Sequence, residues 1–153
     1  MTNVLKLLAL VCSSGFSAGL LVTSFVFVPG WRDLEPAKAV DWFSQHGLAL
    51  GLVMLPMGIL ALLFILAAAR MTYRASGMDR QAILWGLAAL AAFGSIIVLP
   101  MYFSGANTLF FDNLIEVGQV HSEIDTWGRW NWSRTVFSLL ATTFAVVAMQ
   151  YDR

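Results

Sequence analysis

Four segments of this chain are long and apolar enough to cross a lipid bilayer, and they constrain the fold more than any other feature. They comprise residues 4–28, 47–69, 81–103 and 127–149. A membrane-spanning helix needs about 20 predominantly apolar residues. The last segment reaches that length only if its helix starts near Thr126, with Asp125 as N-cap. We therefore predict one transmembrane domain over residues 1–153, an all-α integral membrane four-helix bundle.

The composition agrees with a membrane protein. Of the 153 residues, 59% are hydrophobic and 12% charged, whereas soluble domains average about 45–50% and about 25%. So few charges could not cover the surface of a soluble domain of this size. The zero net charge gives no indication of nucleic-acid binding. We expect the first segment to be a retained helix, because its apolar run exceeds the roughly 7–15 residues of a signal-peptide core.

The charges of the connecting segments predict an orientation. The short connection "RMTYRASGMDR" is rich in arginine, and cytoplasmic loops carry an excess of basic residues. We therefore predict a bacterial inner-membrane protein with both termini in the cytoplasm and two long loops outside. Within these loops, "EPAKAVDWFSQHG" and "ANTLFFDNLIEVGQV" suggest short amphipathic helices, the first starting at Pro36. The two loops carry most of the acids: Asp33, Glu35, Asp41, Asp112, Glu116, Glu123 and Asp125.

Small residues and prolines in the segments bear on helix packing. In lipid, close helix contacts depend on small residues. They could serve a homodimer or contacts within the chain, and we expect contacts within the chain. Prolines inside the second and third segments predict kinks. The residues concerned are Gly15, Gly19, Gly47, Gly51, Gly58, Pro56 and Pro100.

The stretch "DTWGRWNWSRTVFSLL" at the start of the fourth segment is the strongest candidate for function. On a helix, Trp127, Trp130, Asn131 and Arg134 fall at i, i+3, i+4 and i+7 and share one face. An arginine at the centre of a span costs about 2.5–3.5 kcal/mol on insertion scales. Arg134 either extends to the outer headgroups beside an aromatic belt or points inward to an acid or an anionic ligand. A shared face with Asn131 favours the inward orientation.

Further polar residues reach the same level by topology: His46, Tyr102, Asn107 and His121. The two histidines with Glu123 could be considered as metal ligands, but their spacing matches no helical metal pair, and we predict neither a metal nor a cofactor. Cys12, the only cysteine, lies in an apolar run without a nearby base. No GxSxG, phosphate-loop or GxGxxG motif is present.

Several of these motifs together resemble the anthrone oxygenase-like family of small four-span integral membrane proteins, most of which are uncharacterised. The resemblance lies in "SFVFVPG" ending the first segment, in "LPMYFSGAN" ending the third, and in a Trp-x3-Asn-x2-Arg signature formed by Trp127, Asn131 and Arg134. Characterised relatives oxidise anthrones to anthraquinones with dioxygen, without a flavin or a known metal.

The resemblance implies roles for the residues of this chain. Arg134 and Asn131 would hold the oxyanion of an enolate. His46 or His121 would act as the base. An aromatic slot would be lined by further residues, namely Trp127 and Trp130 with Tyr102 and Asn107.

Two functions therefore remain open on the sequence. The chain is either a small membrane enzyme or binding protein for an apolar aromatic, anthrone- or quinone-like molecule, or a non-catalytic helical subunit of a larger membrane complex or homo-oligomer. The direction of the polar face of the fourth helix distinguishes them. An inward face beside a cavity favours the first, and a face turned to lipid or to another chain favours the second.

Overall fold

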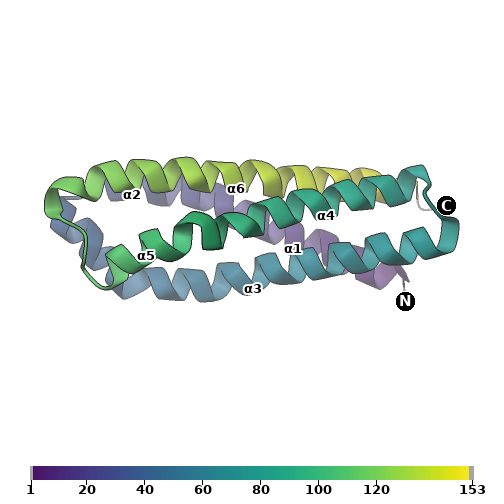
Figure 1. Ribbon diagram of the computed structural model, residues 1–153, viewed down its shortest axis with the longest axis horizontal. Helices are drawn as coiled ribbons and strands as arrows, with labels where there is room; N and C mark the ends of the chain where they lie inside the picture. The colour runs from purple at the N-terminus through teal and green to yellow at the C-terminus, as the bar shows by residue number, and fades with distance from the viewer. Residues whose placement is uncertain (1, 152–153) are drawn as a thin grey trace.

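The computed structural model describes residues 2–151, and these form four long helical segments lying side by side (Figure 1). The segments are Asn3–Arg32, Pro36–Ser76, Arg80–Phe111 and Val117–Met149, each long and apolar enough to span a membrane. No strand occurs among the described residues. The all-α four-helix bundle and its membrane setting are confirmed.

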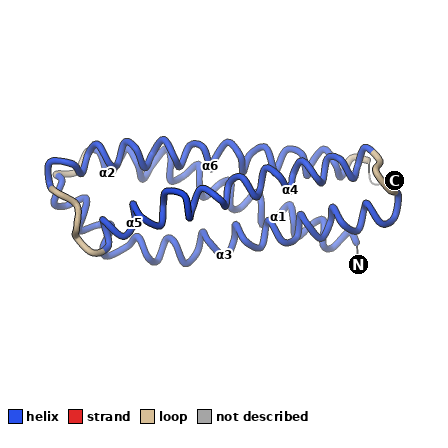
Figure 2. The backbone as a smooth tube through the Cα atoms, viewed as in Figure 1, coloured by secondary structure: helices blue, strands red, loops and turns tan. Residues whose placement is uncertain are grey.

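The helices are longer than the apolar runs of the sequence. The third, α3 (Pro36–Ser76), has 41 residues, which corresponds to about 60 Å, twice the thickness of the hydrocarbon layer of a bilayer. Pro36 is its first residue, as predicted, but the segment that follows is the start of α3 and not a separate surface helix. Loops are confined to the two ends of the bundle (Figure 2).

The first and third segments each contain a π-helical turn. The first segment consists of α1 (Thr2–Val22), the turn η1 (Thr23–Phe27) and α2 (Val28–Arg32). The third consists of α4 (Arg80–Val98), η2 (Leu99–Phe103) and α5 (Ser104–Phe111). Pro29 follows η1 closely and Pro100 lies within η2, where the missing proline N–H and the ring disturb a regular α-helix. Such π turns are frequent at functional sites. By contrast, α3 continues through Pro56.

The fourth helix begins earlier than predicted. A short helical turn, η3 (Val117–Gln119), leads into α6 (Val120–Met149). The prediction of Asp125 as N-cap is wrong, since Asp125 lies inside α6 and forms an ion pair with Arg32. The helix starts earlier because Val120 and Ile124, one turn apart, are both fully buried in the bundle. The predicted helix over "ANTLFFDNLIEVGQV" is likewise interrupted: its first part belongs to α5, a turn with Asn113 at positive φ follows, and its last residues form η3 and the start of α6.

Each helix packs against two neighbours, in the cyclic order α1, α3, α4, α6. The first residues of α1 and the last of α6 lie at the same end as the α3–α4 connection (Figure 1). We call this the terminal end and the opposite one the cavity end. The terminal-end core is rich in alanine: Ala9, Ile65, Ala68, Trp85, Ala88, Ala89, Ala91, Ala92, Ala141, Ala145 and Ala148. The cavity-end core is aromatic, containing Trp31, Phe43, Phe103, Phe110 and Trp127.

Glycines bring α1 and α3 close together, as expected for contacts within the chain. A methyl group added to Gly15 would lie 2.6 Å from Met57 Cε, and one added to Gly19 would lie 2.5 Å from Met54 Sδ. Gly58 is packed equally tightly against Phe16. These glycines therefore form the α1–α3 interface. They are not left as an open surface for a second copy of the chain.

Candidate functional site

The polar face of α6 points into the bundle. Asn131 is 1% exposed and Arg134 is 7% exposed, and Trp127 is buried beside them. The inward orientation that the shared face favoured is the one in the structure. The side chain of Arg134 does not extend along the outside of the bundle toward headgroups.

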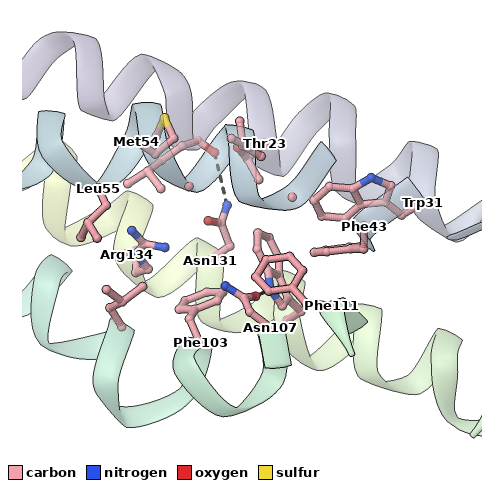
Figure 3. A pocket seen from close by; sticks show the side chains of 16 residues that line it. Thr23, Trp31, Phe43, Met54, Leu55, Phe103, Asn107, Phe111, Asn131 and Arg134 are labelled. Atoms are coloured by element: carbon pink, nitrogen blue, oxygen red, sulfur yellow. Dashed lines mark hydrogen bonds between the residues drawn. The ribbon is translucent and has the colours of Figure 1, made fainter. Parts of the chain in front are cut away.

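These three side chains line a cavity at the cavity end of the bundle (Figure 3). Its empty volume is about 560 Å³, including the part that is open to the surroundings. All four helical segments contribute to the wall, which consists of Leu20, Thr23, Trp31, Phe43, Gly47, Leu50, Gly51, Met54, Leu55, Leu99, Phe103, Asn107, Phe111, Trp127, Asn131 and Arg134.

The guanidinium of Arg134 is a buried positive charge with no counter-ion in the part of the chain that the structure describes. Among residues 2–151, no carboxylate forms an ion pair with it, and its Nε has no hydrogen-bond partner. Its closest recorded electrostatic contacts are two ring faces, Phe103 at 4.8 Å and Phe16 at 5.7 Å from the guanidinium carbon to the ring centroid. Cation–π contacts compensate part of the lost hydration. An anion or a hydrogen-bond acceptor entering the cavity would supply the rest.

Three acids of the cavity end have partners other than Arg134. Asp125 pairs with Arg32, and Glu35 pairs with Lys38. Glu123 accepts a 2.5 Å hydrogen bond from the hydroxyl of Tyr102. These contacts keep three carboxylates away from Arg134, so the loop-acid partner considered from the sequence is not present for it.

Asn131 is held by the first helical segment, through one residue of α1 and one of η1. Its Nδ2 donates to the carbonyl oxygen of Leu20 at 3.3 Å and to Ser24 Oγ at 2.8 Å. Its Oδ1 is buried and has no hydrogen-bond partner among the described residues. The amide therefore has its nitrogen toward α1 and its oxygen toward the remaining space, on the side where Arg134 lies (Figure 3).

Aromatic side chains form one side of the cavity. Trp127 makes edge-to-face contacts with Trp31 at 5.2 Å and with Phe103 at 4.9 Å between ring centroids. Its indole N–H donates to Asn107 Oδ1 at 2.9 Å, which fixes both side chains in the wall. Edge-to-face pairs stabilise such clusters beyond their buried area. The result is a rigid apolar wall beside the guanidinium.

Four of the predicted site residues lie outside the cavity wall. His46 is exposed and stacks on Trp42, and its Nδ1 lies 3.1 Å from the carbonyl oxygen of Trp42. His121 is also exposed, with Nε2 3.0 Å from the carbonyl oxygen of Leu34. Trp130 stacks on Tyr102 with 5.3 Å between centroids. On the helical wheel Trp130 is displaced by about 60° from Trp127, enough to turn it away from the cavity.

The structure thus brings together Trp127, Asn131, Arg134 and Asn107. The sequence analysis did not identify the part of the wall that comes from α1 and α3, including Leu20, Phe43 and Gly51. Both π turns, η1 and η2, contribute residues to the wall, and each has a proline within it or close after it. These prolines were the feature of the sequence that could have indicated a cavity at this level. Among the described residues, no group of three or more histidine, cysteine or acidic side chains is placed to hold a metal ion.

Comparison of the chain with protein-family models gives no match, and comparisons with curated proteins and with solved structures find no similar protein. The function must therefore be argued from the site itself.

Proposed function

We propose that the cavity binds an apolar aromatic molecule that carries an oxygen substituent, with its rings against the aromatic wall and its oxygen toward Arg134. The buried guanidinium of Arg134 is the observation that carries this proposal, since it lines a cavity and has no carboxylate partner among residues 2–151. Keeping such a charge buried is costly. A ligand that accepts its hydrogen bonds would offset that cost.

The resemblance to anthrone oxygenases suggests a reaction for the same site. An anthrone that loses a proton beside its carbonyl becomes an enolate, and a fixed positive charge stabilises that anion. Dioxygen then oxidises the ring carbon: the methylene group loses two hydrogens and gains one oxygen atom, and the other oxygen leaves as water. Among the described residues, Arg134 is the only ionisable one in the cavity wall. In this scheme the proton would leave through the open side of the cavity, and Arg134 would act by lowering the pKa of the bound anthrone.

We further propose that the cavity end faces the outside of a bacterial inner membrane. The last turns of α3 and the first residue of α4 carry Arg70, Arg74 and Arg80, and an excess of basic residues is typical of the cytoplasmic side of a membrane protein. Exposed apolar side chains of α3 run from Leu48 to Leu66 and mark the part of the helix that contacts lipid. The cavity begins at the outer limit of this region, so an apolar ligand could reach it from the outer leaflet.

Oxygen uptake by the purified protein in lipid nanodiscs tests the proposal. We expect anthrone to be oxidised faster than with empty nanodiscs, and Arg134→Gln to lose the acceleration. Arg129→Gln is the matched control, because Arg129 lies on the same helix but is exposed. Binding is measured separately with anthrone itself in the absence of oxygen, where it cannot be oxidised. Binding without oxidation would leave a binding protein. The absence of both would favour the alternative of a non-catalytic helical subunit of a larger complex.

A further inference from the structure

The hydrogen-bonding pattern of the cavity restricts the ligand more narrowly. The Asn131 amide cannot rotate freely, because a backbone carbonyl such as that of Leu20 can only accept a hydrogen bond. Nδ2 must therefore face the first helical segment, where Ser24 Oγ in η1 is its second acceptor. Oδ1 consequently points away from Leu20, within the cavity wall, as a buried acceptor that has no donor among the described residues.

An unused donor lies beside this unused acceptor. Arg134 follows Asn131 by three residues on α6, so their Cβ atoms are about 5–6 Å apart. Both side chains are more than nine-tenths buried and both line the cavity. Arg134 Nε has no acceptor, and no hydrogen bond joins the two side chains within residues 2–151. Figure 3 shows the amide oxygen and the guanidinium on adjoining sides of the same space.

Few ligand groups satisfy both side chains. A ketone only accepts and would leave Oδ1 unpaired, and an ammonium only donates and would be repelled by Arg134. A hydroxyl group does both, since its hydrogen can be donated to Oδ1 while its oxygen accepts from Arg134. The aromatic wall formed with Trp127 and Phe103 suits a hydroxyl attached to a ring.

We infer that the cavity selects aromatic hydroxyl compounds, such as phenols, naphthols or the enol form of an aromatic ketone, over ethers and ketones of the same size. This inference rests on the proposed function. It adds Asn131 Oδ1 as the group that determines specificity. A buried acceptor left without its donor is expected to lower affinity by about 5- to 150-fold.

Three probes of matched size test it: 1-naphthol, 1-methoxynaphthalene and 1-tetralone. Each is equilibrated by dialysis against protein-containing and empty nanodiscs, so that partition into lipid is subtracted. We expect 1-naphthol to bind at least about fivefold more tightly than the other two. Equal affinities would overturn the hydroxyl inference and leave the aromatic site standing, as would tightest binding of 1-tetralone. No binding of any probe above empty nanodiscs would overturn the proposed function itself.

Two variants separate recognition from structure. Asn131→Leu removes Oδ1 and should bring the naphthol-to-ether affinity ratio close to one. Ser24→Ala removes one anchor of the amide but retains Oδ1 and the bond to Leu20, and should keep the ratio of the wild type. The ratio compares ligands on the same protein, so partial loss of folded protein does not change it. A ratio preserved in Asn131→Leu would contradict the inference.

Discussion

The two ends of the bundle use the same four helices but pack them by different means. At the terminal end, alanines let the helices approach closely around the fully buried Trp85. At the cavity end, large rings meet edge to face and do not fill the space between the helices. Small side chains interdigitate without gaps, whereas a few rigid rings fix a shape. The difference suggests that one end holds the bundle together and the other holds a ligand.

Adding side-chain volume to the tightly packed terminal end should give the largest effect. Ala145→Leu adds three carbon atoms to a position with no exposed surface in the terminal-end core. We expect the free energy of unfolding to fall by about 1–3 kcal/mol, since the neighbouring helices must separate. The measurement is denaturant unfolding in bicelles, followed by circular dichroism. Val146→Leu, at an exposed apolar position, is the control and should be neutral. An unchanged stability for Ala145→Leu would mean that the terminal end is loosely packed.

Removing the buried charge at the cavity end should raise the free energy of unfolding, whereas overpacking the terminal end should lower it. Arg134→Met keeps much of the side-chain length but removes a guanidinium that has no carboxylate partner among residues 2–151. Replacing a buried ion pair with apolar side chains of similar volume is often neutral or stabilising by about 1–4 kcal/mol, and a buried charge without a partner has less attraction to lose. We expect a gain toward the lower part of that range, because contacts with Phe103 and Phe16 are also lost.

Arg134→Met should also lose affinity for 1-naphthol, so the stability of the protein and its binding of ligand should change in opposite directions. Arg129→Met, at an exposed position of α6, should change neither quantity. A marked loss of stability in Arg134→Met would show that the arginine serves the fold, and the argument for a ligand would then lose its basis.

The sequence predicted the bundle because the physics of spanning helices is local: about 20 apolar residues suffice to identify each one. It also predicted the shared face of Trp127, Asn131 and Arg134, which follows from helical periodicity alone. It missed the true lengths of α3 and α6, since their polar ends beyond the membrane carry no apolar run. Those ends are helical because Phe43 and Ile124 are buried in the bundle, which is a tertiary effect.

The wall residues of α1 and α3 could not be predicted for a related reason. Nothing in the periodicity of one helix says which residue of another lies opposite it. Leu20 enters the site through its backbone carbonyl, which accepts a hydrogen bond from Asn131, and a backbone group has no signature in the sequence. The prediction of His46 and His121 in the site relied on topology, which places residues at a level of the membrane but does not determine the direction of a side chain.

Filling the cavity should have a smaller effect on stability. A side chain at Gly51 would meet no atom within 4 Å of its Cβ, although Gly51 belongs to the cavity wall. We expect Gly51→Leu to be neutral or to stabilise by up to about 1 kcal/mol, through helix propensity, while 1-naphthol binding is lost. Gly86→Leu, equally unobstructed but at an exposed site of α4, should show the same propensity gain and keep binding. Retained binding in Gly51→Leu would place the ligand elsewhere.

The smallest effect concerns the terminal end and depends on pH. The Asp79 carboxylate caps α4 by accepting a 2.7 Å hydrogen bond from the backbone N–H of Ala82, and this bond lowers the pKa of Asp79 below its ordinary value. A lowered folded-state pKa means that the carboxylate stabilises the fold at pH values above the unfolded pKa, about 3.9. The stabilisation is lost as the pH falls through the folded-state pKa.

Asp79→Asn keeps a capping oxygen without the charge. Melting temperatures of both proteins between pH 7 and pH 3 should therefore differ by a constant amount near neutrality and converge at the acid end. A difference that persists at the lowest pH would mean that the charge of Asp79 is not what stabilises this turn.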